Sequence, residues 1–583
     1  MMAIRRRFGA QFQGNGRTCF GLWAPDAREV RVETADGRDW PLEGSDSGWF
    51  EATLPCPPGT RYRYRIDGRP GVPDPASQFQ PDGVHGHSQV LDHDAYAWRV
   101  DEWRGRPWHE AVIYELHVGL FGSYAEVERF LPRLVELGVT AVELMPLGEF
   151  PGRRNWGYDG VLPFAPASAY GTPEQLKHLI DSAHGMGLMV FVDVIYNHFG
   201  PDGNYLAQYA AAFFRDDRQT PWGQAIDFRR GEVREFFYEN ALMWLLDYRI
   251  DGLRFDAVHA IPDSAFLVEM ARRLRGAAGP ERHLHLVLEN DDNRASLLRQ
   301  GYDAQWNDDG HHALHVLLTG ENDGYYQDYP EPLRCLARCL AEGFVYQGEA
   351  TATAGRAANR VRPGAGRFVL FLQNHDQVGN RAFGERLSVL AEPQALRLAI
   401  ALQLLAPMIP LLFMGEECAA REPFLYFTDH QGELADAVRE GRRKEFGEFG
   451  RFGDGAALAS LPDPNAVETF ERSRPGLADC DPAWRGFYRQ LLEIRHEYLI
   501  PRLRGARSLG VTTIAGAALS ARWRLGDGSD WRIDFNPSPL EAEVEPPAAA
   551  TQVLFLDNLA CAEYRRGRLS PRSIAVSLEP AHE

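Results

Sequence analysis

Acidic side chains follow, or end, several short apolar runs in this sequence. Asp256 and Glu289 each come directly after such a run, Asp193 follows Val190–Val192 within a third run, and Asp376 comes shortly after a fourth. A single acid in such a place is usually a solvated loop residue or a helix cap. If the runs are parallel strands whose carboxyl ends meet at one mouth, the four carboxylates converge there and predict an active site.

One of these runs also contains a cation. Arg254 stands between Leu253 and Phe255, and a strand interior excludes charge unless the charge has a partner. Asp256 is two residues on, so it lies on the same side of the strand. We expect the two to pair, and the cation to keep the Asp256 carboxylate ionised at neutral pH. Glu289 follows an apolar stretch instead, which should raise its pKa.

Two carboxyls with different protonation states are what cleavage of a glycosidic bond requires. One must be ionised to attack or stabilise the anomeric carbon, and the other must hold a proton for the leaving oxygen. Asp256 suits the first task and Glu289 the second. Trp156, Tyr158 and Trp306 lie near the same ends, and we expect them to stack on sugar faces, with packing inside loops as the alternative.

Eight apolar runs between residues 111 and 414 alternate with helical patterns. Most are continuously hydrophobic, as expected for strands buried on both faces of a parallel sheet. Between them, Tyr124–Leu137, Gly231–Tyr248 and Ala265–Leu274 show helical periodicity. The count predicts a (β/α)₈ barrel; an open doubly wound sheet is disfavoured because no G-x-G-x-x-G follows a strand. The eight runs are Ala111–Leu116, Val139–Met145, Leu188–Ile195, Asp251–Phe255, Leu284–Leu288, Tyr302–Trp306, Arg367–Leu372 and Ile409–Met414.

Short β patterns separated by turn signals stand on both sides of these runs. Arg28–Glu33 and Tyr62–Ile66 alternate polar with apolar or aromatic residues, which is typical of a small β-sandwich. The predicted fold class is therefore α/β: a (β/α)₈ TIM barrel with loop insertions over residues 109–501, an N-terminal β-sandwich module over 1–108, and a C-terminal β-sheet domain over 502–583.

Composition and charge narrow the class of protein. The 583 residues include 81 acidic and 62 basic ones, with a formal charge of −19, which disfavours nucleic-acid and anionic-membrane partners. No window of ~18 apolar residues exists for a membrane span, and the N-terminus lacks the apolar stretch of a signal peptide. Seven cysteines are too sparse for a disulfide scaffold. We therefore expect a soluble, reduced, cytoplasmic protein, with Cys335 and Cys339 as small apolar side chains on a helix.

Four segments resemble the signature regions of the α-amylase superfamily, glycoside hydrolase family 13, in order and spacing. The resemblance implies that Asp256 is the nucleophile, Glu289 the general acid/base and Asp376 the transition-state stabiliser of a retaining hydrolase. The N-terminal FGLWAPDAREVRV is similar to the module that precedes the barrel in branching and debranching members. The four segments are DVIYNH (193–198), GLRFDAVH (252–259), LEND (288–291) and QNHD (373–376).

Further segments resemble a trehalose-releasing family of that superfamily over nearly the whole length. The resemblance implies hydrolysis of the α-1,4 bond next to the terminal trehalosyl unit of maltooligosyl trehalose, with release of trehalose and a shortened maltooligosaccharide. Gly310 is the main departure, because a bulkier residue is common there. The segments are NWGYDG (155–160), RFDAVHAI (254–261), QWNDDGHHALHVLLTGE (305–321), QNHDQVGNRA (373–382), PFLYFTDH (423–430) and GRRKEFGEFG (441–450).

The resemblance also implies a set of substrate-binding residues and a partner. Tyr158 would stack on the sugar at the cleavage point, and His198, Arg254 and His375 would orient hydroxyls and carboxylates. A maltooligosyl trehalose synthase would act with the protein in the same pathway. The remaining candidates for substrate binding are Asp159, His259, Asn307, Asp308, Asp309, His312, Gln377 and Asn380.

A 1,4-α-glucan branching enzyme is the nearest alternative. It shares the order of module and barrel but typically has Gln after WGY and another sequence around the last Asp, where this chain has Asp159 and Gln377–Asn380. A glycan-binding protein without catalysis is a second alternative, disfavoured because all three carboxylates are present.

A metal-dependent barrel hydrolase is the third alternative. It requires an H-x-H motif near the end of the first strand, where only His117 occurs. The pairs His85/His87 and His283/His285 lie in the N-terminal module and at the start of a strand. No EF-hand-like loop occurs either. We therefore expect no metal, no required calcium and no cofactor.

Overall fold

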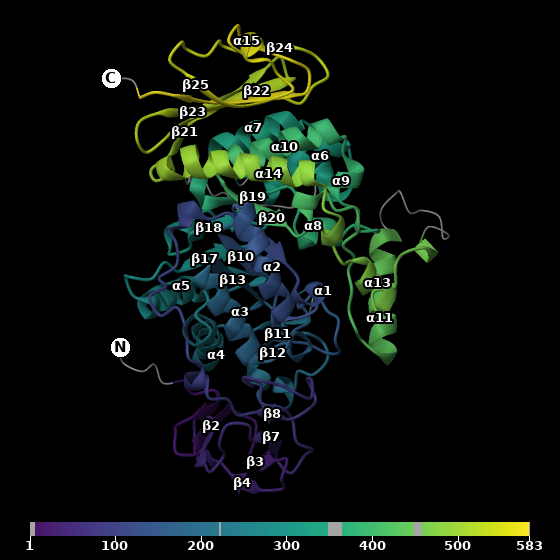
Figure 1. Cartoon of the computed structure of the whole chain (residues 1–583). Coiled ribbons are helices and arrows are strands. Elements are labelled where there is room, and N and C mark those ends of the chain that lie inside the picture. Colours follow the sequence, from purple (N-terminus) through teal and green to yellow (C-terminus); the bar gives the residue numbers. More distant parts are fainter. Residues whose placement is uncertain (1–5, 221–222, 348–363, 448–457, 582–583) are drawn as a thin grey trace.

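The structure is a computed structural model that describes residues 6–220, 223–347, 364–447 and 458–581. Figure 1 shows the chain running from two small sheets at the bottom, through a barrel, to a sheet at the top. Along the described residues, no helix combines the length and the apolar character that crossing a bilayer requires.

The central domain is a closed barrel of parallel strands in the order β10-β13-β16-β17-β18-β19-β20-β9. Each of the eight strands lies within one of the apolar runs, so the predicted barrel is confirmed and the open sheet is wrong. The strands are β9 Ile113–Leu116, β10 Ala141–Leu144, β13 Met189–Val194, β16 Gly252–Phe255, β17 His285–Leu288, β18 Ala304–Trp306, β19 Phe368–Phe371 and β20 Ile409–Phe413.

Helices surround the barrel where the helical periodicity predicts them. Tyr124–Leu137 forms α2 with these bounds, capped by Ser123 and ended by Gly138, whose positive φ of 101° suits glycine. The predicted Gly231–Tyr248 helix is α4 (Gly231–Leu242) with a π-helical turn after it, and α5 spans Ser264–Ala278. The others are α1 Val118–Phe121, α3 Pro173–Gly185, α6 Asp308–Thr319, α7 Pro332–Glu342, α8 His375–Gly379, α9 Leu387–Leu390, α10 Pro393–Leu405, α11 Gly432–Gly447, α13 Val467–Arg472 and α14 Pro482–Ile494.

The N-terminal module consists of two four-stranded sheets, β1-β2-β6-β5 and β4-β3-β7-β8. The ring of Phe20 on β2 packs edge-on against Tyr62 on β7 at 4.9 Å between centroids, which joins the two sheets as a sandwich. The backbone N–H groups of Arg7 and Phe8 donate to the Glu239 carboxylate of α4 and attach the module to the barrel. The strands are β1 Gly9–Phe12, β2 Thr18–Trp23, β3 Val30–Thr34, β4 Asp39–Pro41, β5 Glu43–Gly44, β6 Trp49–Leu54, β7 Arg61–Ile66 and β8 Ser88–Gln89.

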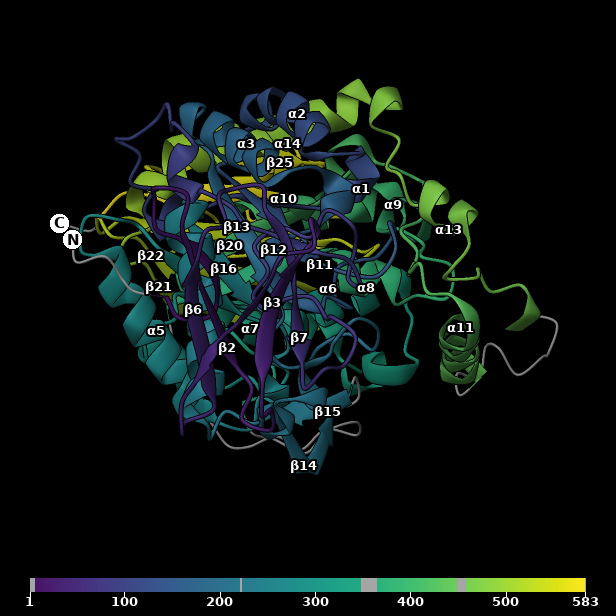
Figure 2. The same cartoon turned by 90° about the horizontal axis from the view of Figure 1, so that it is seen from below.

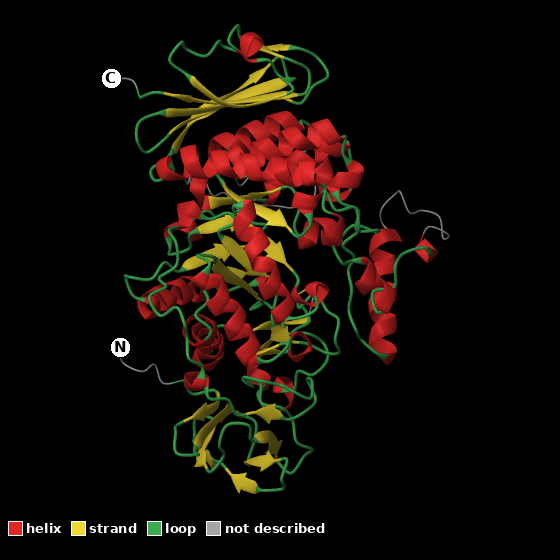
Figure 3. Ribbon diagram, viewed as in Figure 1, coloured by secondary structure: helices red, strands yellow, loops and turns green. Residues whose placement is uncertain are grey.

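The C-terminal domain contains a five-stranded antiparallel sheet in the order β21-β22-β23-β27-β25. Figure 3 shows a layer of helices between this sheet and the barrel. The indole N–H of Trp531 donates to the carbonyl of Leu405 at the end of α10, at 2.9 Å, and so joins the sheet to this layer. The strands are β21 Arg507–Ile514, β22 Ala518–Arg524, β23 Asp530–Asn536, β25 Gln552–Asp557 and β27 Ser573–Glu579.

Smaller elements complete the fold. Figure 2, the view from below, shows α11 and α13 standing to one side of the barrel, as they also do in Figure 1. Two short hairpins belong to barrel loops, and a third pair of strands and α15 belong to the C-terminal domain. They are β11 Gly148–Glu149 with β12 Leu162–Pro166, β14 Phe214–Thr220 with β15 Gly223–Ile226, β24 Ala542–Glu543 with β26 Arg568–Leu569, and α15 Cys561–Tyr564.

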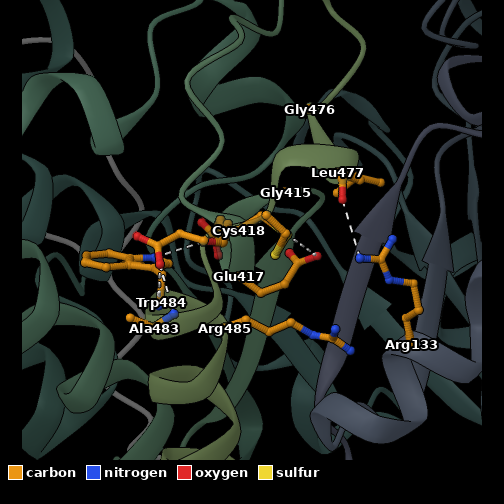
Figure 4. The surroundings of a disulfide bond; sticks show 12 residues. Arg133, Gly415, Glu417, Cys418, Gly476, Leu477, Ala483, Trp484 and Arg485 are labelled. Atoms are coloured by element: carbon orange, nitrogen blue, oxygen red, sulfur yellow. Dashed lines mark hydrogen bonds between the residues drawn. A yellow bond between two sulfur atoms is a disulfide. The ribbon is translucent and has the colours of Figure 1, made fainter.

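One disulfide joins Cys418, just after β20, to Cys480, just before α14 (Figure 4). The prediction of a wholly reduced chain is therefore wrong for this pair. The two cysteines are 62 residues apart, so only the tertiary structure brings them together. Cys335 and Cys339 lie on α7 as predicted, the first half-buried and the second buried.

Candidate active site

Charged side chains line the inside of the barrel directly above its apolar filling. The inner face of the strands is packed with apolar residues such as Ile113, Ala141, Phe191 and Val287. Side chains alternate along a strand, so the residue two positions further on points to the same interior. That position holds Glu115, Glu143, Asp193 and Glu289. On β16, Arg254 is the register partner of Asp193 on β13 and of Val287 on β17, two residues before Glu289. The predicted convergence at one mouth follows from this shared interior face.

Arg254 is hydrogen-bonded to three carboxylates at the mouth of the barrel. Its fully buried guanidinium donates from Nη1 to Asp193 at 2.5 Å and to Asp256 at 2.9 Å, and from Nη2 to Glu289 at 2.7 Å. The group also lies 4.1 Å from the centroid of the Trp306 ring, a cation–π contact. The predicted pairing of Arg254 with Asp256 is confirmed. The pKa of Glu289 is raised, as predicted, but the bond to Arg254 shows that its setting is not apolar alone.

Burial raises the pKa of both candidate catalytic carboxyls, and the nearby Arg254 charge opposes the rise in both. The Arg254 charge therefore does not by itself make the two carboxyls different, contrary to the prediction. Their hydrogen bonds make them different. Asp256 accepts on both oxygens, Oδ1 from Arg254 and Oδ2 from the Asn197 amide at 2.8 Å. Glu289 accepts on Oε2 alone, from Arg254 and from the backbone N–H of Ala257 at 2.8 Å.

This difference separates the two protonation states. Donors on both oxygens favour the ionised form of Asp256, because a proton on either oxygen would displace a bond. Among the described residues, no hydrogen bond reaches Oε1 of Glu289, so that oxygen is free to carry a proton. The arrangement can supply one carboxylate and one carboxylic acid side by side, each bonded to the same guanidinium.

The third acid, Asp376, is the second residue of the short helix α8 and follows His375. Burial raises the pKa of Asp376, and the His375 charge opposes this rise. The carboxylate accepts from the Asn380 amide at 3.3 Å and lies 3.5 Å from Nε2 of His375. The buried His375 ring bonds through Nδ1 to Glu115 at 2.5 Å. Burial lowers the pKa of His375, but Asp376 and Glu115 outweigh it and raise the pKa to about 9.

Tyr158 lies over this group. Its ring stacks on His375 with centroids 4.9 Å apart and an interplanar angle of 22°, and its hydroxyl donates to Asp193 at 2.5 Å. His198 supports the Tyr158 loop, because its Nε2 donates to the Tyr158 carbonyl at 3.0 Å. Asp159 also binds within the loop, accepting from Asn155 at 2.7 Å and lying 3.4 Å from His430.

Of the three predicted sugar-stacking aromatics, only Tyr158 is accessible. Trp156 is 4 % exposed and Trp306 is 1 % exposed, so the prediction that they stack on sugars is wrong. Trp156 packs face to face on Phe424, with centroids 5.0 Å apart, and Trp306 packs on Arg254. Aromatic type and loop position do not reveal whether the fold covers a ring.

The Asn307–His312 segment divides into residues near the site and residues behind it. Buried Asn307 donates to the Gly343 carbonyl at 2.8 Å, and buried Asp309 accepts from the backbone N–H groups of Val345 and Tyr346. These bonds hold α6 to the segment after α7, so we do not keep the two residues among the proposed substrate ligands. Asp308 is different, because it accepts from Gln377 at 3.1 Å at the site.

The two remaining candidates, His312 and His259, have partners outside the group of three acids. His312 bonds through Nδ1 to the hydroxyl of Tyr329 at 3.1 Å. His259 lies 3.6 Å from Asp291, in the loops that follow Asp256 and Glu289.

Glu115 and Asn197, which bond to His375 and Asp256, were not among the predicted ligands. Neither was Glu143, which lies beside Glu115 without a bond to a site residue. The argument that identified Arg254 applies to Glu115 and Glu143 as well, because each is a charged residue inside an apolar strand run. Asn197 lies within the DVIYNH segment (193–198) that resembles a signature region, but its bond to Asp256 was not predicted.

A cavity of about 590 Å³ opens beside Asn380 and Arg381, just after the Asp376 helix. Residues of the segment between Cys418 and Cys480, including Tyr426 and Phe446, form one wall of the cavity. The last three residues of the 441–450 segment lie outside the described residues. Within the described ranges, no cluster of three or more His, Cys, Asp or Glu side chains is arranged to hold a metal ion.

Comparison with protein families finds three matches along the chain. Residues 7–97 match the family described as carbohydrate-binding module 48 (isoamylase N-terminal domain), and residues 119–223 match the alpha amylase catalytic domain. Residues 506–576 match a domain of unknown function, DUF3459. The matches follow the order of the module, the barrel and the C-terminal sheet.

Curated relatives match over most of the chain. The malto-oligosyltrehalose trehalohydrolase of Deinococcus radiodurans is 42 % identical over 572 residues, covering 95 % of this chain and 93 % of that protein. The enzyme of the same name from Saccharolobus solfataricus is 38 % identical, covering 84 % and 87 %. A 1,4-alpha-glucan branching enzyme of Rubrobacter xylanophilus is 38 % identical but covers only 44 % of this chain.

Solved structures share the fold. A putative alpha amylase from Salmonella typhimurium has a TM-score of 0.92 at 41 % identity, covering 99 % of this chain and 100 % of that one. A pullulanase from Paenibacillus barengoltzii has a TM-score of 0.72 at 21 % identity, covering 98 % and 95 %, and so supports the fold alone.

Proposed function

The chain belongs to the malto-oligosyltrehalose trehalohydrolase family, whose members are glycosidases with an α-amylase-type catalytic domain, and from that membership we propose its reaction. It hydrolyses the α-1,4-glucosidic bond next to the terminal trehalosyl unit of maltooligosyl trehalose. The products are trehalose and a maltooligosaccharide shorter by that unit.

The unequal hydrogen bonding of Asp256 and Glu289 carries the proposed mechanism. Asp256, with donors on both oxygens, is the ionised nucleophile that attacks the anomeric carbon. Glu289, with one oxygen outside these bonds, is the acid that protonates the leaving glycosidic oxygen. The trehalosyl unit leaves, and a covalent glycosyl ester remains on Asp256.

The second half of the reaction reverses these roles. Glu289, now ionised, takes a proton from water, and the water oxygen attacks the anomeric carbon and breaks the ester. Two inversions retain the α configuration, which predicts a separation of ~5–5.5 Å between the two carboxyl groups. Asp376, beside the His375 ring, stabilises the positive charge that develops on the sugar.

Substrate binding is proposed for the residues that border these groups. Tyr158 supplies a partly buried ring at the cleavage point, and Asp308, Gln377 and Asn380 supply polar groups around Asp376. His198 and Asp159 act through the Tyr158 loop, and His259 and His312 complete the proposed set.

The proposal includes a place in metabolism. A maltooligosyl trehalose synthase would supply the substrate, and a cytoplasmic location would bring the two enzymes together with soluble glucans. Five free cysteines are compatible with such a compartment, although the Cys418–Cys480 bond is unusual there.

Product analysis tests this function against the branching alternative. We expect incubation with maltooligosyl trehalose to release trehalose, seen by chromatography, and incubation with amylose to form no new α-1,6 branches. Branch formation without trehalose release would overturn the proposal. Full binding of maltooligosaccharides without any hydrolysis would support the glycan-binding alternative, and loss of activity with a chelator would support a metal-dependent one.

A further inference from the structure

Two carboxyl side chains, Glu115 and Glu143, lie side by side within the barrel. They are paired residues in the register between the parallel strands β9 and β10, so both point to the same face. Each is only 1 % exposed. Like charges this close in a low dielectric repel strongly, which disfavours two charged carboxylates side by side.

The hydrogen bonds indicate which of the two holds the charge. Glu115 accepts from the backbone N–H of His375 at 3.0 Å and pairs with the ring Nδ1 at 2.5 Å. Neither oxygen of Glu143 has a hydrogen-bond partner among the described residues. A buried carboxylate without donors is far costlier than a neutral acid. Burial, with the Glu115 and Asp193 charges, raises the pKa of Glu143 well above its usual range.

His375 is the group on which this charge acts. Its Nε2 has no hydrogen bond within the described part of the chain and lies 3.5 Å from Asp376. The ring of Tyr158 stacks on it, which suits a cation. The charged and titratable groups that face His375 are Glu115, Glu143, Asp193, Asp376, Arg254, His117 and Tyr158.

We propose that Glu115 is a positioning residue whose ionised carboxylate holds His375 as an imidazolium, with Nε2–H directed towards Asp376 and the substrate, while Glu143 is held neutral. Glu115 fixes the ring by bonding its Nδ1 and the backbone of the same residue. Because Glu143 is neutral, it adds no further negative charge to the barrel interior, where Arg254 already forms hydrogen bonds with three carboxylates. The assignment of charge to Glu115 and His375 does not depend on the proposed function. Only the statement that His375 faces the substrate rests on it.

A matched pair of substitutions tests the assignment. Glu115→Gln and Glu143→Gln make the same chemical change on neighbouring strands. His375 is followed by NMR in the full chain labelled at histidine, its signal being identified by its absence in His375→Gln. In Glu115→Gln we expect the titration midpoint of His375 to fall by roughly 1–3 units, and the alkaline limb of the kcat/KM profile for trehalose release to move with it. In Glu143→Gln both should stay as in the parent.

Each outcome of the titration either supports or overturns the assignment of the charge to Glu115. An unchanged His375 midpoint in Glu115→Gln would overturn the proposal, as would a lowered midpoint in Glu143→Gln, which would place the charge on Glu143. If Glu115→Gln does not fold, the parent alone remains a test, because a midpoint below 6.5 would contradict an imidazolium. The NMR titration needs no substrate, so a failure to release trehalose would contradict the proposed function without touching this result.

Discussion

Asp193 and Arg254 form an ion pair of 2.5 Å inside the barrel, with both side chains at most 1 % exposed. They are register partners on the adjacent strands β13 and β16. Because the same guanidinium also holds Asp256 and Glu289, the Asp193 pair fixes the position from which Arg254 reaches both. The geometry of the proposed nucleophile and acid therefore depends on a cation below them.

Two substitutions of Arg254 should separate the effect of its charge from the effect of its forked hydrogen-bonding geometry. Arg254→Met leaves three carboxylates without their cation, and breaking even one buried pair costs ~3–5 kcal/mol, so we expect a chain that unfolds far below the parent temperature. Arg254→Lys keeps the charge but cannot bond in the same fork, so the fold should persist while kcat falls at least ~100-fold, the lower range for losing a positioned proton-transfer group. Thermal unfolding and steady-state kinetics measure both effects. Parental turnover in the Lys variant would contradict the role of the fork.

Asp256→Asn should abolish nearly all turnover of maltooligosyl trehalose while the fold stays intact. The amide is nearly the same size but is not a nucleophile, so no glycosyl ester forms. Trehalose release, circular dichroism and thermal unfolding check the two statements together. A well-folded variant that kept a tenth of the parental rate would show that the nucleophile has been assigned wrongly.

Glu289→Gln should lower kcat by the ~10²–10⁴-fold that is typical of general acid–base catalysis. An amide cannot protonate the leaving oxygen, but a substrate whose leaving group needs no proton avoids that step. We therefore expect partial recovery of the first half-reaction with an activated α-glucosyl substrate. Equal losses on both substrates would argue against the acid role.

The disulfide between Cys418 and Cys480 should stabilise the chain, because it closes a 62-residue separation that includes α11 and α13. Disulfides typically contribute ~2–4 kcal/mol. We expect reductant, or Cys418→Ser, to lower the unfolding temperature. Cys561→Ser changes an exposed free thiol, so we expect it to leave the unfolding temperature unchanged. Unfolding that reductant does not affect would mean that the bond contributes no stability.

Glu416 predicts a pH dependence of stability. Burial raises its pKa from 4.5 to about 8, although the Gln373 amide opposes the rise. Between those two values the folded chain binds a proton that the unfolded chain has released, so stability falls as pH rises through this window. Glu416→Gln should make the fall between pH 5 and pH 8 smaller in thermal unfolding, whereas the exposed Glu433→Gln should not. An unchanged slope in Glu416→Gln would contradict the raised pKa.

Local sequence was sufficient to predict the barrel and the place of its mouth. Strands buried on both faces must be apolar throughout, and helices around them must show one apolar face, so β16, β19 and α2 were visible as patterns. Acids placed just after such strands had to meet, because parallel strands end together. Asp256, Glu289 and Asp376 follow from that reasoning alone.

Only the tertiary structure decided which partner each of these groups has. Glu115 and His375 are 260 residues apart, and they meet because β9 closes the barrel against β20. Arg254 meets three carboxylates because β16, which Asp256 follows, lies between β13, which carries Asp193, and β17, which Glu289 follows. Contacts with distant parts of the chain cover Trp156 and bind Asn307 and Asp309. Hydrophobic periodicity reports how a segment is buried, whereas hydrogen-bond partners depend on the register between distant strands, which no local pattern contains.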